Sequence, residues 1–333
     1  MTNINKIEKI YFSTTNPVLN STREEFGQAI AEIAAGNDQI IGLSADLTYS
    51  TKMNIFAEKF KNRFFHLGVA EQNMIGVAAG LALGGKIPVC TSYAIFQPGR
   101  CWEQIRQSIC YSNLNVKMVS THAGLSVGPD GASHQALEDL ALTRVLPNLT
   151  VISPCDGPQA KKATFAMINH PGPVYLRLTR EPSIAVTTNE TSFEIGRGQI
   201  FRSGNDVTII STGTMIGVAL QAAQILAEQM NVSAQVINLH TLKPMDEKLL
   251  IQAAQDTQAI VTIEEHQIIG GLGSGVAEIL ATNYPVPMEM LGMKDQFGQS
   301  GKAHQLLEHY GLTVEAVIKA VKKVNKRKLK SAS

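Results

Sequence analysis

Short apolar runs alternate with helical stretches along the first half of the chain. Phe26, Ile30, Ile33 and Ala34 recur at the spacing of one helix face, and comparable stretches separate the apolar runs. Strands that alternate with helices predict βαβ units, and therefore a mostly parallel sheet with helices on both faces. The runs that we interpret as strands are 40–43, 64–67, 87–90, 116–120, 150–153 and 174–178.

The periodicity lapses into polar residues between about 181 and 198, and a second alternating set follows. We interpret the polar stretch as the linker between two doubly wound α/β domains, 18–185 and 196–333. The elements of the second set are strands 207–211, 234–239, 259–264 and 287–291, with helices near 216–230, from 246, from 273 and over 313–324.

The start of the first helix carries a local signal. Thr22 and Glu25 stand three residues apart, the spacing of a capping box, so the helix is predicted to begin there. Residues 1–17 show no clear period and are predicted to form an extended lead-in.

Composition narrows the class of protein. The chain has 333 residues, of which 44% are hydrophobic and 17% charged, and its formal net charge is +1. These values are typical of a folded protein with a sizeable core, and they lack the broad basic excess of nucleic-acid binders. The basic C-terminal cluster is interpreted as a solvated, frayed end, with a nucleic-acid or membrane arm as the alternative; it consists of Lys322, Lys323, Lys326, Arg327, Lys328 and Lys330.

The cysteines and the apolar runs bear on location. Cys90, Cys101, Cys110 and Cys155 form no Cys-x-x-Cys pair and no zinc-like spacing. No segment approaches the roughly 18 apolar residues of a membrane span, and the N-terminus has no leader pattern. We therefore expect a reduced, cytoplasmic protein that binds neither membrane nor nucleic acid.

The most informative segment is 66–85. A strand ends near Leu67, a glycine turn follows, and a helix begins close to Glu71, where a carboxylate suits the helix dipole. Glycine costs about 1 kcal/mol inside a helix, so Gly76 and Gly80 indicate close approach of another backbone. From the residues alone, a surface carboxylate on a tightly packed helix is the favoured interpretation of Glu71.

The segment resembles the cofactor-activating motif of the thiamine diphosphate enzymes of the transketolase family. The resemblance runs from about residue 21 to the end of the second domain. It implies a pyrimidine-binding thiamine diphosphate fold followed by a transketolase C-terminal-like domain. It also implies that Glu71 is catalytic and binds the cofactor: its carboxylate hydrogen-bonds N1′ of the aminopyrimidine, and the shared proton favours the imino tautomer that deprotonates C2.

Further matches to the family surround the expected cofactor. Tyr93 and Phe96 follow a predicted strand, where core packing alone would also explain them. The resemblance implies that both aromatic rings contact the pyrimidine, with Tyr93 where a Phe is common. Asp46 resembles a residue near the cofactor at the subunit boundary.

A second signature covers 121–135. It follows a strand, turns through Gly128 and Gly131, and is predicted to enter a helix near Ser133. A Ser133 N-cap with an Asp130 turn is the structural alternative. The resemblance implies that His122 contacts a substrate phosphate. It further implies that Asp130 and His134 bind sugar hydroxyls and the donor carbonyl region, with His134 also catalytic. Pro129 stands where the family commonly has an acidic residue.

Three more positions resemble the family's sugar-phosphate site. These are Arg23, Ser50 and Arg180. Arginine suits phosphate through its bidentate fork, although a single arginine is more often a surface ion-pair residue.

The glycine-rich run 262–275 superficially resembles a nucleotide-binding fingerprint. It follows a strand, but no acidic partner stands about 20 residues further on in a recognisable βαβ context. The same run is typical of the C-terminal domain of the family that the chain resembles, where it shapes a turn and packs between subunits, so we interpret it as structural.

One expected motif is missing. Full-length members of the family carry a Gly-Asp-Gly motif and a later Asn that hold Mg²⁺ and the diphosphate, and this sequence contains no Gly-Asp-Gly. The resemblance therefore implies a split enzyme: thiamine diphosphate and Mg²⁺ are expected, with the metal ligands on a separate N-terminal subunit and none here. A heterotetramer with two of each chain is the natural symmetric assembly.

Several activities remain compatible with the sequence. The first is transfer of a two-carbon ketol unit between sugar phosphates, which includes a sulfonated or branched ketose. A split deoxyxylulose phosphate synthase and the beta subunit of a 2-oxo acid dehydrogenase share the fold and the activating Glu. The former tends to have Arg in place of His122, and the latter lacks this loop pattern. A catalytically idle regulatory or scaffolding homologue is the alternative of another class.

Overall fold

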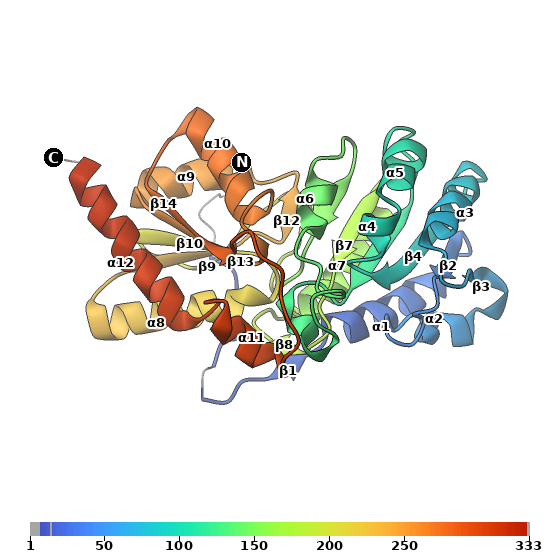
Figure 1. The fold of residues 1–333 in the computed structure, drawn as a ribbon, viewed down its shortest axis with the longest axis horizontal. Helices are drawn as coiled ribbons and strands as arrows, with labels where there is room; N and C mark the ends of the chain where they lie inside the picture. Colours follow the sequence, from blue (N-terminus) through green and yellow to red (C-terminus); the bar gives the residue numbers. More distant parts are fainter. Residues whose placement is uncertain (1–6, 14, 332–333) are drawn as a thin grey trace.

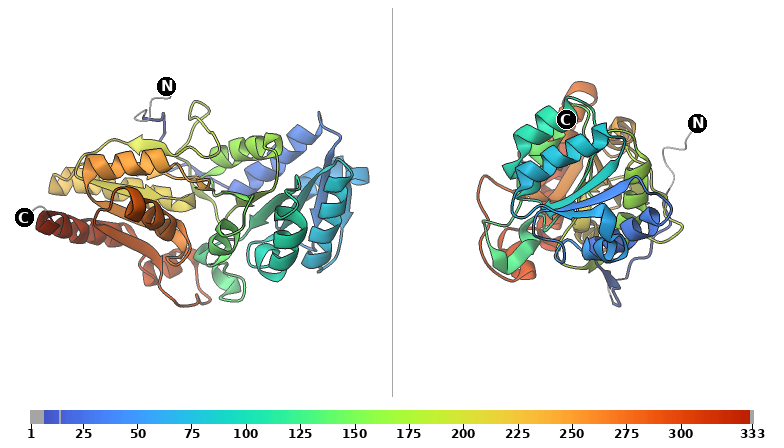
Figure 2. Two further views of the ribbon diagram at one scale, coloured as in Figure 1. Left: turned by 90° about the horizontal axis from the view of Figure 1, so that it is seen from above. Right: turned by 90° about the vertical axis from the view of Figure 1, so that its right-hand side faces the viewer.

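Two α/β units lie side by side in the computed structural model, which describes residues 7–13 and 15–331 (Figure 1). Each unit is a mostly parallel sheet enclosed by helices, so the predicted fold class is confirmed. In both Figure 1 and the view from above in Figure 2, the C-terminal helix lies at the end of the molecule away from the first unit.

The first unit contains a seven-stranded sheet in the order β12-β6-β7-β5-β4-β2-β3. Its strands are parallel except β12, which runs antiparallel to β6. The strands are β2 (Ile40–Ser44), β3 (Phe64–His66), β4 (Ile87–Tyr93), β5 (Lys117–Thr121), β6 (Thr150–Ile152), β7 (Val174–Arg177) and β12 (Thr241–Lys243). A separate two-stranded ribbon pairs β1 (Leu19–Asn20) with β8 (Ser183–Ile184).

Helices cover both faces of this sheet. One core packs α1 (Thr22–Ala34) and α7 (Gly157–Asn169) on one face, and another packs α3 (Glu71–Leu83) and α6 (Asp139–Arg144) on the other. Alternate strand residues serve the two cores, which explains why buried parallel strands read as continuous apolar runs. The shorter helical segments are α2 (Asn54–Lys59), Lys61–Arg63, α4 (Gln97–Arg100), α5 (Trp102–Gln104), the π-helical turn Ile105–Cys110 and the 3₁₀ turn Leu125–Asp130.

The second unit has five strands in the order β14-β13-β10-β11-β9, parallel except β9 at the edge. Its strands are β9 (Gln199–Arg202), β10 (Val207–Ser211), β11 (Ala234–Asn238), β13 (Ile260–Gln267) and β14 (Met288–Met293). Its helical segments are the 3₁₀ turn Gly213–Met215, α8 (Ile216–Met230), α9 (Glu247–Thr257), α10 (Leu272–Asn283), α11 (Ala303–His309) and α12 (Val314–Ser331). Helices α8 and α12 share one core, and α9 and α10 share the other.

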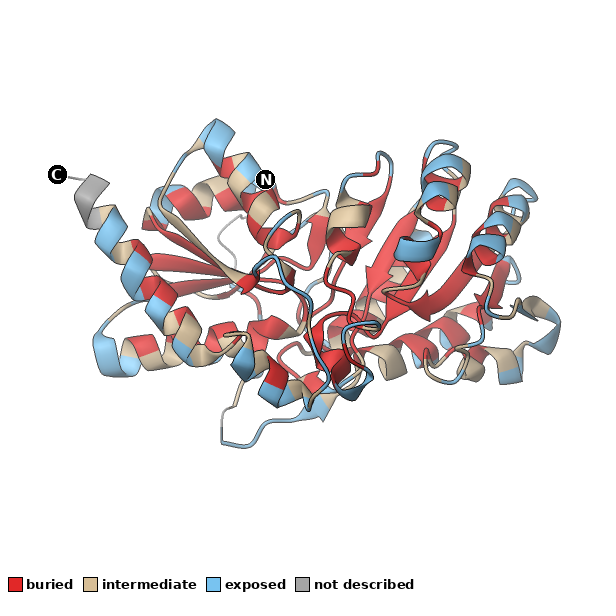
Figure 3. Ribbon diagram, viewed as in Figure 1, coloured by how far each residue is buried: buried red, intermediate tan, exposed pale blue. Residues whose placement is uncertain are grey.

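The two units are joined by more than the linker. Strand β12, from the second predicted domain, pairs with β6 of the first, and one apolar core includes residues of both units. The buried positions accordingly continue from one sheet to the other (Figure 3). The domain limits 18–185 and 196–333 stay predictions, and the shared strand was not predicted.

Some local predictions were wrong. The N-cap of α1 is Ser21, whose Oγ accepts a hydrogen bond from the Glu24 N–H at 3.4 Å, so the predicted Thr22 capping box is displaced by one residue. Helix α6 begins at Asp139 instead of near Ser133, because 132–137 are held as a loop. Ser133 is therefore not an N-cap.

The predicted frayed C-terminal end is wrong for the described residues, because they continue as a helix. Helix α12 continues through Ser331, and the Lys323 ammonium and the Arg327 guanidinium pair with the Glu289 carboxylate at 2.8 and 2.9 Å. Lys328 donates to the carbonyl groups of Asp206 and Thr257. Lys323, Arg327 and Lys328 therefore hold the last helix against its own domain, whereas Lys322 and Lys326 are exposed. The Lys330 side chain lies outside the described residues.

Two further predictions concern the ends of the chain and its location. The predicted lead-in 1–17 falls partly outside the described residues, but Ile7 and Ile10 form isolated bridges with Ile200 and Thr187.

All four cysteines are buried and free. Within the described part of the chain, no helix has the length and apolar character needed to span a bilayer.

Candidate active site at the carboxyl edge of the first sheet

The predicted site residues converge because the first sheet is parallel. The carboxyl ends of parallel strands share one edge, and ligands of such sheets bind beyond it. Asp46 and Ser50 follow β2, Glu71 follows β3, Tyr93 and Phe96 end or follow β4, the signature 122–134 follows β5, and Arg180 follows β7. Arg23, near the start of α1, reaches the same edge, where its Nη1 donates to the Ser50 carbonyl at 2.8 Å.

Glu71 is the first residue of α3, and its side chain is only 4% exposed. No side chain caps this helix start, so the carboxylate stands beside unsatisfied backbone N–H groups, an environment that favours negative charge. Arg100 Nη1 donates to both Glu71 oxygens, at 3.1 and 3.3 Å. The pair borders an open pocket of about 470 Å³, lined by 69–73 and Arg100.

Aromatic rings form the inner wall of the site. Tyr93 stacks on Phe96 with ring centroids 5.8 Å apart, and its ring also stacks on His122 at 3.8 Å. His134 lies edge-on to Phe96 at 5.4 Å. Tyr93 is 9% exposed and contacts both Phe96 and His122. Its ring is therefore packed in the core and still reaches the surface of the site.

His122 is held in an unusual state. Its backbone is left-handed, with φ of 57°, and its side chain is 3% exposed. Nδ1 lies 2.8 Å from the Thr121 hydroxyl oxygen. Burial first, and then the positive charges of Arg23 and Arg180, lower the pKa of His122 to about 3. The ring is therefore a neutral hydrogen-bonding group at physiological pH, while the arginines carry the positive charge of the site.

This state predicts acid sensitivity. The unfolded chain protonates His122 near its ordinary pKa of about 6.5, whereas the folded chain resists protonation down to about 3. Stability is therefore lost as the pH falls below 6.5, and from pH 7 to 5 His122 alone removes about 1–2 kcal/mol from the free energy of unfolding. Urea unfolding at both pH values, compared between the wild type and His122→Asn, isolates this contribution, since other groups titrate in both proteins.

Asparagine suits the control because it tolerates left-handed backbone. Ring NMR of the two proteins identifies the His122 signals, which should not shift between pH 8 and pH 5, about two units above the folded pKa. A midpoint near 6 for those signals would contradict the buried, neutral ring.

The loop after β5 is fixed by both units. Arg180 Nη1 donates to Asp130 Oδ1 at 3.0 Å and to the Val127 carbonyl at 2.7 Å. Gln135 Nε2 donates to the Gln299 carbonyl of the second unit at 3.0 Å. The Pro129 carbonyl accepts a hydrogen bond from the Ser300 hydroxyl. The loop with Pro129 is therefore anchored by backbone contacts that need no acidic side chain at that position.

The remaining predicted residues are more open. Asp46 has a left-handed φ of 61°, is exposed, and lies 3.2 Å from His66 Nε2. His134 is partly exposed, with Nδ1 2.9 Å from the Ser133 hydroxyl. The structure thus gathers Arg23, Ser50, His122 and Arg180 at one end of the site. Asp46 instead lies beside His66, at the end of the edge strand β3.

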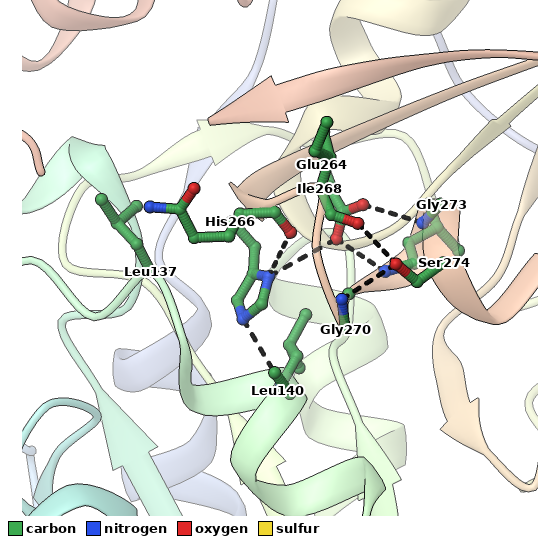
Figure 4. A network of polar contacts seen from close by, with 12 residues as sticks. Leu137, Leu140, Glu264, His266, Ile268, Gly270, Gly273 and Ser274 are labelled. Atoms are coloured by element: carbon green, nitrogen blue, oxygen red, sulfur yellow. Dashed lines mark hydrogen bonds and ion pairs between the residues drawn. The ribbon is translucent and has the colours of Figure 1, made fainter. Parts of the chain in front are cut away.

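The backbone N–H groups of the glycine-rich turn in the second unit are hydrogen-bonded within the chain itself (Figure 4). Glu264 accepts hydrogen bonds from the backbone N–H groups of Leu272 and Gly273 at 2.6 and 2.8 Å. His266 Nε2 accepts from the Ala141 N–H of the first unit at 3.4 Å. The helix start that would bind a nucleotide phosphate is therefore capped by a buried carboxylate, in agreement with the structural interpretation.

Two family models match the chain in succession. The transketolase pyrimidine-binding domain matches residues 20–183, and the transketolase C-terminal domain matches residues 196–317. The chain belongs to the transketolase family.

Relatives of similar length exist within the family. A protein of Methanocaldococcus jannaschii provisionally named a transketolase C-terminal section is 44% identical over 307 residues, which cover 91% of this chain and 96% of the relative. A 6-deoxy-6-sulfo-D-fructose transketolase subunit of a Clostridium species (strain MSTE9) is 40% identical, covering 92% and 95%. A solved structure described as a split gene transketolase, inactive beta4 tetramer, is 48% identical with a TM-score of 0.86, covering 92% of this chain and 99% of that one.

The residues fit the cofactor that the transketolase family uses. A buried carboxylate at a helix start and an adjacent aromatic wall offer the acidic and the stacking contacts that an aminopyrimidine ring needs. Among the described residues, no group of three or more His, Cys, Asp or Glu side chains is placed to hold a metal ion.

Arg100 is the site residue that sequence reasoning missed. It stands 29 positions after Glu71, at the end of the four-residue helix α4, and no motif marks it. In the sequence, Arg100 is marked only by the preceding Pro98-Gly99 pair, which follows the aromatic residues at the end of a predicted strand. That pair does not indicate the direction of the Arg100 side chain.

Proposed function

We propose that this chain is the C-terminal subunit of a split transketolase. It transfers a two-carbon ketol unit from a ketose phosphate to an aldose phosphate, and it acts only together with a separate N-terminal subunit. The observation that carries the proposal is the buried Glu71 carboxylate, which opens at the same sheet edge as the His122 and arginine cluster.

Thiamine diphosphate supplies the electron sink for ketol transfer when it is bound. In this chain, Glu71 holds a proton at N1′ of the aminopyrimidine. Tyr93 and Phe96 contact the face of that ring, and Asp46 lies near the cofactor at the boundary with the partner. The burial of Glu71 supports this role, because a proton shared in a water-excluded place is transferred with little reorganisation.

The other residues bind and orient the sugar phosphate. Arg23 and Arg180 attract the anionic group, and neutral His122 and Ser50 add hydrogen bonds. Asp130 and His134 bind sugar hydroxyls and the donor carbonyl region, with His134 as a proton carrier. One relative is named a 6-deoxy-6-sulfo-D-fructose transketolase subunit, which supports leaving the anionic group of the substrate open in this proposal.

A separate chain completes the site in this proposal. That chain holds the diphosphate through Mg²⁺, and two copies of each chain form a heterotetramer. One solved relative, of which this chain covers 99%, is described as an inactive beta4 tetramer. An inactive assembly of such chains alone supports the need for a second kind of chain. The relative named as a C-terminal section supports the same division.

Reconstitution tests the proposed function. The chain is mixed with its N-terminal counterpart, thiamine diphosphate and Mg²⁺, and ketol transfer from xylulose 5-phosphate to ribose 5-phosphate is followed. We expect no turnover from either chain alone and sustained turnover from the mixture. Full turnover by this chain alone would contradict the split. Turnover with pyruvate in place of the ketose would favour the synthase or dehydrogenase reading, and assembly without any turnover would favour the idle homologue.

A further inference from the structure

The Glu71 carboxylate is already engaged by a planar cation of its own chain. Arg100 Nη1 bridges both carboxylate oxygens, and the guanidinium carbon lies 4.0 Å from the centroid of the Phe96 ring. Arg100 thus makes two contacts at once, one with an acidic group and one with an aromatic face. These are the two contacts that the proposed function assigns to the aminopyrimidine ring.

A guanidinium group is a close substitute for such a ring. It is flat, it donates hydrogen bonds in its own plane, and it stacks on aromatic faces. The pair with Glu71 lies at the mouth of the open pocket formed by 69–73 and Arg100. Within the described residues, Arg100 is the only cation paired with Glu71.

The two partners differ in how they are held. The Glu71 side chain is 4% exposed, whereas that of Arg100 is 49% exposed. The Arg100 backbone is tied to α3 by a hydrogen bond from Gln72 Nε2 to its carbonyl, at 3.1 Å. The guanidinium therefore has solvent to move into while its backbone stays in place, and the carboxylate does not.

We infer that Arg100 is a placeholder for the cofactor ring. It balances the charge of Glu71 and covers Phe96 in the unassembled chain, and its guanidinium leaves both when the aminopyrimidine binds. The inference rests on the proposed function, and it makes Arg100 a positioning residue that acts through Glu71. It follows that the ion pair competes with cofactor binding.

Cofactor affinity tests this competition. Thiamine diphosphate is titrated by calorimetry into the assembled complex, with Mg²⁺ present, for the wild type and Arg100→Gln. A half-exposed ion pair is worth less than about 1 kcal/mol, so its removal should lower the Kd about two- to five-fold. Arg106→Gln is the matched control, because Arg106 is exposed and bonds only to Gln107 among the described side chains; its Kd should equal that of the wild type.

A double variant shows whether Arg100 acts through Glu71. In a Glu71→Gln background there is no carboxylate charge to compete for, so Arg100→Gln should no longer lower the Kd. An unchanged or raised Kd for the single variant would overturn the inference, since Arg100 would then stay in contact with the bound cofactor. The proposed function would survive that outcome as long as the reconstituted wild type turns over.

The placeholder inference can still be tested if Arg100→Gln fails to fold or assemble. Arg100→Leu, which keeps an apolar contact with Phe96, replaces Arg100→Gln if the latter fails to assemble, and the same drop in Kd is expected. If neither variant assembles, the placeholder is also rejected, because a half-exposed group that leaves its site must be dispensable for folding.

Discussion

Replacing Glu71 with glutamine is expected to lower kcat of the reconstituted enzyme about 10²–10⁴-fold, the range typical of a lost proton-transfer group. Glutamine keeps the size and one hydrogen-bonding oxygen of the side chain but cannot hold the proton at N1′. The loss should therefore appear in kcat and leave partner assembly intact. Steady-state kinetics of the reconstituted complex, after assembly is verified by gel filtration, measures it.

A neighbouring carboxylate provides the control. Glu103 is exposed on the short helix α5, close in sequence to Arg100, and its carboxylate accepts a hydrogen bond from Gln104. Glu103→Gln should retain wild-type kcat. If Glu71→Gln also retained it, the catalytic assignment of Glu71 would be wrong.

The second large effect concerns stability. Asp139 at the start of α6 is almost fully buried, and it pairs with Arg177 Nε at 2.8 Å and accepts from the Tyr175 hydroxyl at 2.8 Å. Arg177 Nη2 also donates to the carbonyls of Ala136 and Glu265, so the pair joins β7, the loop 132–137 and the second unit. Removing one partner of such a pair leaves a buried charge uncompensated.

Asp139→Ala should therefore lower the free energy of unfolding by about 3–5 kcal/mol, measured by urea denaturation. The pair of Asp38 with Arg63, 3.4 Å apart, is the control, because the Asp38 side chain is 93% exposed. Asp38→Ala should cost less than about 1 kcal/mol, because surface ion pairs contribute little. Equal losses in the two variants would show that the buried pair does not stabilise the joint between the units.

Elements with a strong apolar period could be predicted from the sequence. The predicted strand 207–211 and helix 216–230 coincide with β10 and α8. The convergence of the site residues also followed from sequence, because parallel strands fix which loops meet. The cap of α1 was missed by one residue, since Ser21 and Thr22 are both good caps and only the backbone decides between them.

The rest depends on contacts between distant segments. Strand β12 has three residues, too few for a period, and it exists because it pairs with β6 about 90 positions earlier. Residues 132–137 form a loop because Gln135 bonds to Gln299. The pairing of Arg100 with Glu71 likewise joins two helices through side-chain direction, which no spacing rule encodes.

The most direct test of the account is the structure of the assembled two-chain complex with thiamine diphosphate bound. We expect N1′ of the aminopyrimidine to lie within hydrogen-bond distance of the Glu71 carboxylate, about 2.6–3.2 Å, with the diphosphate held by the other chain. A cofactor ring bound elsewhere, out of reach of Glu71, would contradict it.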